Sequence, residues 1–336
     1  MMKLDKQQLK GFIKDKRILI TGAAGSIGSE LVRQLCLFNP ESITFFDRNE
    51  TAVFYLEKEL NKEFPNVKII PRLGSICDEQ RAAVIFSECM PHIVYHVAAN
   101  KHVPLSEENP SEAIYNNIYG TSVILNASIL HNVEVFTFVS TDKAVNPSSI
   151  MGMTKRVAEI LIQCMYNFTK TKCITVRFGN VFGSSGSVVQ IFKSQLQKDK
   201  SLTITHPDME RYFISAQDAT KLLIQSSMFG KTGDLFMLDM GNPIKIKDLA
   251  KDIIISEGYN LDEISIKYTG IRPGEKLQED LMLDSEISED TEVPQIKKII
   301  NNKYYSNETL TLINHLIDLS KDRSSEDLKN ELKKII

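Results

Sequence analysis

The chain has 336 residues, of which 42% are hydrophobic and 25% are charged, and its formal net charge at pH 7 is −3. This length suits one large domain or two closely joined domains, and the composition excludes a mostly disordered chain. The small negative charge gives no electrostatic attraction for nucleic acid or an anionic membrane, so we expect neither as a partner.

Targeting and cysteine patterns favour a cytoplasmic protein. No stretch is long and apolar enough to span a bilayer, and residues 1–17 are charged without the apolar core of a signal peptide. The five cysteines are scattered without CxxC spacing, so we expect neither a disulfide framework nor a metal site.

Strands and helices alternate over the first half of the chain. Apolar runs predict strands at 17–20, 43–47, 67–73, 92–99, 133–140 and 173–180. Helical spacing of apolar residues predicts helices at 29–38, 52–64, 111–130 and 148–165. This alternation with short turns predicts an α/β fold, a doubly wound parallel sheet with helices on both faces.

The pattern becomes irregular beyond Gly179. Loops lengthen, and Gly and Ser cluster in residues 179–187. We expect a main domain over residues 1–178, with a return segment near 212–240, and a smaller C-terminal α/β lobe over most of 179–336. The charged, amphipathic residues 324–336 predict a final helix.

A glycine-rich turn separates the first strand from the first helix. It contains Gly22, Gly25 and Gly28, with Ser26 and Ile27 between the last two. Small residues let the backbone approach a pyrophosphate, and the helix N-terminus offers N–H groups and a partial positive charge. The turn in this setting predicts dinucleotide binding and a Rossmann-like domain.

An acid at the end of the second strand bears on the choice of cofactor. Asp47 lies about twenty residues beyond the glycine turn, where a carboxylate can bind the adenosine ribose. Arg48 could neutralise the additional phosphate of NADP. We expect NAD and leave NADP open, and we add Ile76, Ala98 and Ala99 to the predicted cofactor contacts.

Reactive side chains follow the fifth predicted strand. Thr141, Asp142 and Lys143 stand at its carboxyl end, the edge where doubly wound sheets bind ligands. A turn at 146–147 leads into a helix that carries Met151 and Lys155 at i, i+4 spacing, hence on one helix face.

With the glycine turn, this arrangement resembles the extended short-chain dehydrogenase/reductase family, in which a Tyr-x-x-x-Lys pair serves the nicotinamide. Here Lys155 is the lysine, and Met151 stands in place of the tyrosine. That replacement is similar to the configuration-retaining UDP-N-acetylglucosamine 4,6-dehydratases of polysaccharide biosynthesis. The chain resembles the soluble catalytic domain of these often membrane-anchored enzymes. The resemblance extends over residues 96–110, 116–121, 177–188, 209–213 and 272–277.

The resemblance implies a lyase that removes water from a nucleotide-linked N-acetylhexosamine through transient hydride transfer to NAD(P)+. It assigns Asp142 as the acid toward the C6 hydroxyl, Lys143 as the base at C5 and Thr141 as a contact of the C4 oxygen. Lys155 would bind the nicotinamide ribose. Because Met151 cannot accept a proton, we hypothesise that Asp142 takes the C4 hydroxyl proton, directly or through Thr141 or a water.

Substrate contacts also follow from the resemblance. The implied residues are Lys101, His102, Asn180, Arg211, Arg272 and Glu275. Arginine suits the diphosphate because its planar fork matches phosphate oxygens. Glu210, Gln190 and Ser75 depart from residues common in the group, and the first two fall in the expected substrate lobe. UDP and GDP sugars therefore both stay open.

Two other functions remain open. An inverting 4,6-dehydratase that also epimerises C5 would share Thr-Asp-Lys but normally keeps the tyrosine. A non-catalytic NAD(P)-binding sensor would have little reason to keep Asp142, Lys143 and Lys155 together. The resemblance also implies a homo-oligomer, formed through the helices around 111–130 and 150–166. Neither its order nor the downstream sugar pathway follows from the sequence.

Overall fold

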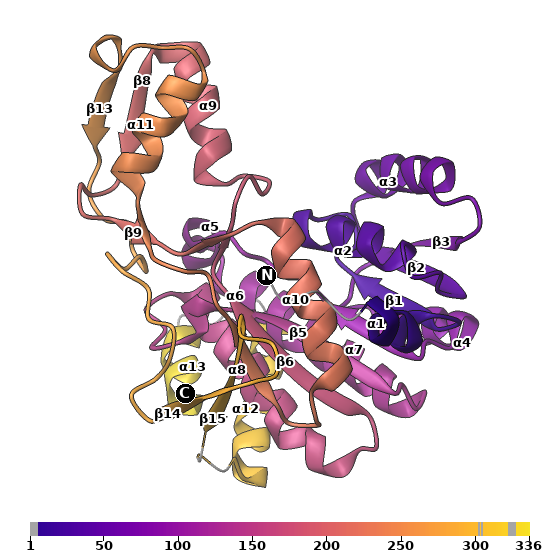
Figure 1. Ribbon diagram of the computed structural model, residues 1–336. Helices are drawn as coiled ribbons and strands as arrows, with labels where there is room; N and C mark the ends of the chain where they lie inside the picture. Colours follow the sequence, from indigo (N-terminus) through magenta and orange to yellow (C-terminus); the bar gives the residue numbers. More distant parts are fainter. Residues whose placement is uncertain (1–5, 302, 304, 322–326) are drawn as a thin grey trace.

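A large twisted sheet organises the molecule (Figure 1), seen in a computed structural model that describes residues 6–301, 303, 305–321 and 327–336. Its strands are β1 (Arg17–Thr21), β2 (Ser42–Asp47), β3 (Lys68–Leu73), β4 (Ile93–His96), β5 (Val135–Thr141), β6 (Lys172–Phe178), β11 (Leu235–Leu238), β14 (Glu286–Asp290) and β15 (Ile296–Asn301). Among the described residues the order is β14-β15-β11-β6-β5-β4-β1-β2-β3. The strands from β3 to β11 run parallel, whereas β15 is antiparallel to both its neighbours. The predicted doubly wound sheet is confirmed.

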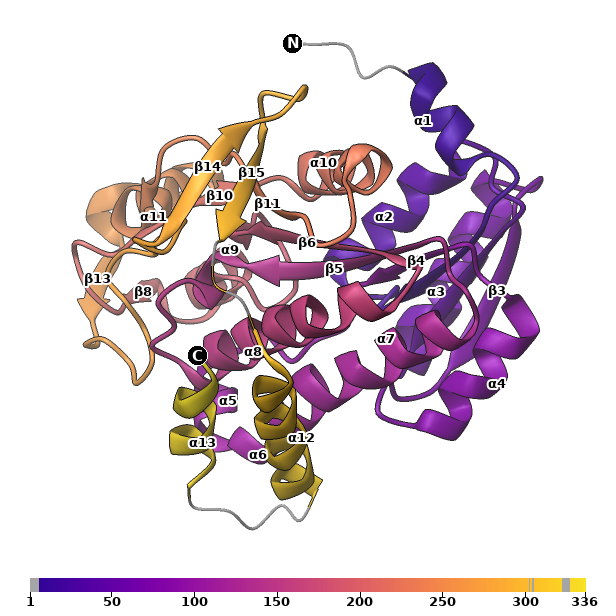
Figure 2. The same cartoon turned by 90° about the horizontal axis from the view of Figure 1, so that it is seen from below.

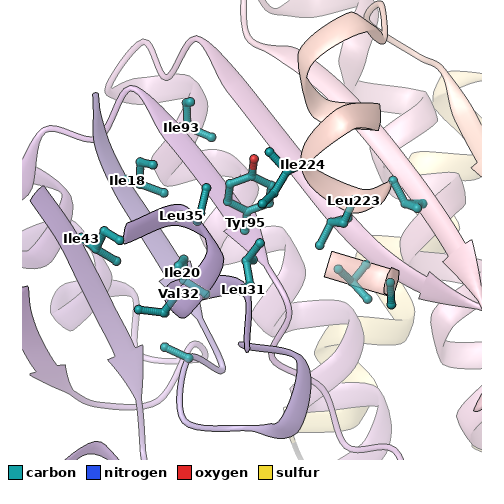
Figure 3. Packing of buried hydrophobic residues seen from close by; sticks show 14 of the residues in the cluster. Ile18, Ile20, Leu31, Val32, Leu35, Ile43, Ile93, Tyr95, Leu223 and Ile224 are labelled. Atoms are coloured by element: carbon teal, nitrogen blue, oxygen red, sulfur yellow. The ribbon is translucent and has the colours of Figure 1, made fainter. Parts of the chain in front are cut away.

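Side-chain alternation along β1 divides the core into two layers. Ile18 and Ile20 belong to a cluster with α2 (Ser26–Cys36), α3 (Glu50–Glu63) and α10 (Ala216–Phe229), as Figure 3 shows for part of it. Leu19 points to the opposite face. There it joins a cluster with α4 (Glu79–Cys89), α7 (Gly120–Leu130) and α8 (Ile150–Met165). Helix α1 (Lys6–Ile13) lies beside α10 on the first face (Figure 2).

Several predicted elements have other bounds in the structure, and one predicted helix is interrupted. Strand β3 contains Pro71, which is tolerated because β3 lies at the edge of the sheet. The helix predicted over 111–130 is interrupted: α6 (Pro110–Ile114) is followed by a π-helical turn, Tyr115–Tyr119, before α7 begins. A short helix α5 (Val103–Glu108) precedes α6, and 3-10 turns cover Asp142–Ala144, Tyr166–Phe168 and Leu261–Glu263.

The chain beyond Gly179 divides between the large sheet and a smaller lobe. The lobe contains α9 (Val188–Asp199), β8 (Ser201–Ile204), α11 (Ile246–Ser256) and β13 (Ser265–Tyr268), around a separate apolar cluster that includes Phe192 and Leu249. Short ladders pair β7 (Asn180–Val181) with β10 (Phe213–Ile214) and β9 (Glu210–Arg211) with β12 (Ile244–Lys245). The return segment carries α10 and β11, and the later strands β14 and β15 also join the large sheet.

Two C-terminal helices form a third layer outside α8. Helices α12 (Asn307–Lys321) and α13 (Leu328–Ile335) lie on the side of α8 away from the sheet (Figure 2). Ile313, Leu316 and Leu332 are buried there against apolar side chains of α6 and α8. Helix α13 lies within the predicted final helix, of which residues 324–326 are outside the described residues.

This layer bears on the predicted dimer contact. The outer surfaces of α6 and α8 pack against α12 and α13 of the same chain. The contact through the helices around 111–130 and 150–166 stays a prediction, as does the homo-oligomer. No helix in the described ranges is long and apolar enough to cross a membrane.

Candidate active site

A cavity of about 900 Å³ lies between the carboxyl edge of the large sheet and the smaller lobe. Nineteen of the predicted site residues line it: Gly22, Gly25, Ser26, Ile27, Asp47, Arg48, Ile76, Ala98, Ala99, Lys101, His102, Thr141, Lys143, Met151, Lys155, Asn180, Arg211, Arg272 and Glu275. Gly28 and Asp142 lie behind the wall. The fold therefore gathers side chains that are far apart in the sequence around one space.

The glycine turn is shaped by two close backbone approaches. Gly22 has φ +67°, and a Cβ there would lie 2.7 Å from Cα of Ala98. A Cβ at Gly28 would lie 2.1 Å from the Gly22 carbonyl oxygen, so Gly28 lets α2 pack against the turn. Helix α2 starts at Ser26 with no side-chain cap, and its first residues line the cavity. This turn can receive an anionic group at the helix N-terminus.

Asp47, the last residue of β2, contacts the glycine turn through hydrogen bonds. Its carboxylate accepts hydrogen bonds from the backbone N–H groups of Ala24, at 3.0 Å, and of Asn49, at 2.9 Å. The side chain that caps α3 is Asn49, which accepts from the Ala52 N–H. Arg48 donates to Oδ1 of Asn100 at 3.2 Å. Asp47 is thus held at the cavity wall with acceptor capacity for hydroxyl groups of a ligand.

Strand β5 leads directly into the reactive segment, residues 141–143. It ends at Thr141, and the next turn buries Asp142 completely. Oδ1 of Asp142 accepts hydrogen bonds from Oγ1 of Thr141, at 2.9 Å, and from Nζ of Lys143, at 3.0 Å. Oδ2 receives no hydrogen bond from the described residues. Asp142 therefore reaches the cavity through its two neighbours, both of which line it.

Helix α8 packs tightly on this segment. Ser149 caps the helix by accepting from the Gly152 N–H at 3.0 Å. A Cβ at Gly152 would lie 2.3 Å from the Lys143 carbonyl oxygen, so only glycine permits this approach. Gly152 was not among the predicted site residues, although it follows Met151 directly.

Lys155 is almost fully buried below the cavity. Its Nζ donates to the Val139 carbonyl oxygen at 2.6 Å and lies 4.0 Å from the centre of the Phe138 ring. Burial lowers the pKa of Lys155 to about 7, against the opposing charge of Glu159. Near neutral pH this lysine can exchange between its charged and neutral forms. Met151, one turn earlier, has no group that can take up a proton.

A carboxylate from the smaller-lobe side completes the reactive cluster. Oε1 of Glu279 lies 3.6 Å from Nζ of Lys143 and 3.7 Å from Nε of Arg211. The Lys143 ammonium also lies 3.4 Å from Oδ1 of Asn180. Glu279 was not among the predicted residues, because nothing in its spacing distinguishes it from a surface acid.

Lys101 and His102 hold the Gly-Ser loop 183–187. Nζ of Lys101 donates to the Ser185 carbonyl oxygen at 2.8 Å, and the ring of His102 lies against Gly186. The Ser185 N–H donates to Oγ of Ser26 at 2.9 Å. The loop therefore bridges the glycine turn and the 101–102 segment across the cavity.

The remaining predicted substrate residues lie on the smaller-lobe side. The guanidinium of Arg211 donates to the carbonyl oxygens of Lys276 and Leu277, at 2.8 and 3.0 Å. The Arg272 N–H donates to Oε2 of Glu275 at 3.2 Å. These contacts order Arg211 and the segment after Arg272 along the cavity, and the arginine guanidinium groups suit an anionic ligand.

Known proteins share this architecture. Residues 18–301 match the model of a family described as polysaccharide biosynthesis protein. The chain is 43% identical to a probable polysaccharide biosynthesis protein, EpsC of Bacillus subtilis, over 87% of this chain and 49% of that one. It spans about half the length of EpsC and of CapD of Staphylococcus aureus.

Two further similarities cover most of both proteins. A protein of Campylobacter jejuni named UDP-N-acetylglucosamine 4,6-dehydratase (inverting) is 34% identical over 81% of this chain and 79% of its own length. The crystal structure of Pen from Bacillus thuringiensis superposes with a TM-score of 0.78 at 33% identity, over 88% of this chain and 90% of Pen. On the match over residues 18–301 and these similarities, the chain belongs to the polysaccharide biosynthesis protein family.

Proposed function

We propose that this protein is a nucleotide-sugar 4,6-dehydratase that converts UDP-GlcNAc or GDP-GlcNAc to the 4-keto-6-deoxy sugar with retention at C5. The observation that carries the proposal is the contact of 3.0 Å between Nζ of Lys143 and Oδ1 of Asp142 at the cavity wall. An acid and a base side by side are what removal of water from adjacent carbons requires.

The glycine turn and Asp47 fit a nicotinamide cofactor. Gly22, Gly25, Ser26, Ile27 and Gly28 would hold the pyrophosphate at the start of α2, with the adenosine ribose at Asp47. Ile76, Ala98 and Ala99 line the same part of the cavity, and Lys155 would bind the nicotinamide ribose. NAD is the proposed cofactor, with Arg48 leaving NADP as the alternative. When bound, it supplies hydride acceptance at sugar C4 and hydride return at C6.

The residues of the chain would then carry out four proton transfers. Thr141 passes the C4 hydroxyl proton to Asp142, along their hydrogen bond of 2.9 Å. Lys143, as the neutral amine, removes the C5 proton, which the neighbouring ketone acidifies. Asp142 gives its proton to the departing C6 hydroxyl, which leaves as water, and Lys143 returns a proton to C5. Each group ends as it began, as a catalytic cycle requires.

Met151 favours retention at C5. It stands one turn before Lys155 in the cavity wall, where a tyrosine would add a second acid. The Campylobacter jejuni relative carries the name of an inverting enzyme, so inversion at C5 is the second candidate function. The nucleotide diphosphate is proposed to lie against Arg211 and Arg272, with Asn180, Glu275, Lys101 and His102 as further contacts.

Proton NMR in deuterated water tests the proposal. The purified protein is incubated separately with UDP-GlcNAc and GDP-GlcNAc. We expect a 4-keto-6-deoxy product that keeps the D-xylo configuration and carries solvent deuterium at C5, and the faster substrate identifies the nucleotide. An L-arabino product formed early would establish inversion. No conversion of either sugar, with cofactor bound to the protein, would favour a non-catalytic sensor.

A further inference from the structure

We infer that Glu279 is a positioning residue for the base Lys143, an inference that rests on the proposed dehydratase function. Glu279 lies in the segment that follows Arg272, and only 5% of its side chain is exposed. Its carboxylate faces the cavity between two cations, Lys143 and Arg211. A buried carboxylate that contacts a reactive lysine from across the cavity can orient the lysine side chain.

Glu279 and Asp142 both contact the Lys143 ammonium, but only Glu279 comes from a distant part of the chain. Asp142 is the preceding residue, so its contact of 3.0 Å does not by itself determine where the long lysine side chain points. Glu279 approaches from a segment more than a hundred residues later, at 3.6 Å. Together with Oδ1 of Asn180, at 3.4 Å, it provides the non-local contacts of the amine.

The segment that carries Glu279 is fastened to the reactive turn itself. Nζ of Lys276 donates to the Val145 carbonyl oxygen at 3.2 Å, and Oγ of Ser148 donates to the Gly274 carbonyl oxygen at 2.8 Å. Gly274 has φ +79°, and a Cβ there would lie 2.8 Å from Cβ of Ser149. These contacts therefore fix the position of the segment relative to the turn that separates Lys143 from α8.

The same carboxylate connects the base to the proposed diphosphate contact. Arg211 donates hydrogen bonds to the carbonyl oxygens of residues 276 and 277, which lie three and two positions before Glu279. The negative charges of Asp142 and Glu279 balance the positive charges of Lys143 and Arg211. Loss of the Glu279 charge would leave Lys143 with Asp142 as its only carboxylate partner among the described residues, and the amine would be free to turn away from C5.

The test compares Glu279→Gln, which keeps the size and removes the charge, with Glu279→Asp, which keeps the charge on a shorter chain. Glu289→Gln, an exposed position on β14, is the matched control. Single-turnover absorbance of the reduced cofactor reports C4 oxidation, and deuterium incorporation reports C5 proton transfer. We expect Glu279→Gln to slow C5 exchange between about 10-fold and 100-fold. C4 oxidation should stay within about threefold, because Thr141 and Asp142 serve that step.

Glu279→Asp should give an intermediate C5 rate, and Glu289→Gln the wild-type rate. Wild-type C5 exchange in Glu279→Gln would overturn the inference. Equal losses of C4 oxidation and C5 exchange, with a raised KM, would also overturn it, because they would assign Glu279 to substrate binding alone.

A second readout needs no turnover and separates this inference from the proposed function. An amine-acylating reagent is added to the protein, and modification of Lys143 is followed by mass spectrometry. Glu279→Gln should accelerate acylation, because the ammonium form loses a carboxylate partner. If the wild-type protein dehydrates neither sugar, the proposed function fails, and this rate still decides whether Glu279 holds Lys143. An unchanged acylation rate would overturn the inference.

Discussion

The molecule contains two charged clusters. One is a buried structural network, and the other lies at the proposed active site. The first joins Arg156 and Glu159 of α8 to Arg177 of β6 and Glu286 of β14, and it is closed to solvent. The second joins Asp142, behind the cavity wall, to Lys143, Glu279 and Arg211, which line the cavity. Each contains two cations and two carboxylates, so charge alone does not distinguish them.

Geometry distinguishes them. In the buried cluster, Arg177 contacts Glu159 at 2.7 Å and Glu286 at 2.8 Å, and Ser140 donates to Glu159 at 2.6 Å. Burial opposes ionisation of Glu159, yet the charges and hydrogen bonds of Arg177 and Arg156 lower its pKa to about 2. In the cavity cluster, two of the contacts are 3.6 and 3.7 Å, and one oxygen of Asp142 receives no hydrogen bond from the described residues. Short, satisfied contacts fix a fold, whereas long contacts beside a cavity leave capacity for a ligand and for proton transfer.

The largest expected effect is on catalysis, from Lys143→Met. Removing the proposed base should lower kcat by about 10²-fold to 10⁴-fold, the usual contribution of general acid–base catalysis. Initial rates with the preferred sugar nucleotide measure it, and circular dichroism checks that the variant is folded. A folded variant with kcat within tenfold of wild type would place the base elsewhere.

The largest expected effect on stability is from Glu286→Gln. The change leaves the buried arginines with one carboxylate, and breaking a buried ion pair from one side costs about 3–5 kcal/mol. Urea unfolding measures the loss, and kcat below the unfolding transition should stay close to wild type. An unchanged unfolding midpoint would mean that this cluster contributes little to the fold.

Ile313→Ala tests the C-terminal layer that covers α8. Ile313 is fully buried in the contact of α12 with α6 and α8. Truncating a buried isoleucine should lower the free energy of unfolding by about 2–5 kcal/mol. Leu312→Ala, an exposed neighbour on the same helix, is the control. Equal, small effects of both changes would show that α12 packs weakly.

Lys155→Met tests the pH dependence of stability. The pKa of Lys155 is about 7 in the folded protein and about 10.4 in an unfolded chain. Between these values the unfolded state binds the additional proton, so stability rises with pH by up to about 1.4 kcal/mol per unit. Lys155→Met should lack this slope when unfolding is measured between pH 7.5 and 8.5. An identical slope in both proteins would mean that Lys155 stays charged.

The smallest expected effect is from Asp290→Asn. Asp290 pairs with Lys297 on the same strand as Glu286, but its side chain is exposed. Water screens such a pair, so the melting temperature should not change measurably in differential scanning calorimetry. A decrease comparable to that of Glu286→Gln would remove the distinction between buried and exposed pairs on β14.

Local pattern was sufficient to predict much of this protein. Apolar periodicity predicts the six strands and the strand end at Thr141. The glycine turn at Gly22–Gly28 follows from backbone conformations and close approaches that glycine permits. Parallel strands bring their carboxyl ends to one edge, so the grouping of Asp47, Thr141 and Lys143 around one cavity was also predictable.

Only the tertiary structure decided the non-local features. Glu279 reaches Lys143 because its segment is fastened to residues 145–148, a relation that no spacing in the sequence encodes. Glu159 and Glu286 are buried because Arg156 and Arg177 neutralise them, whereas in sequence they resemble solvated acids. The covering of α8 by α12 and α13 likewise depends on how three helices pack. Periodicity identifies which face of a helix is buried, but the partner that buries it is determined only when the chain is folded.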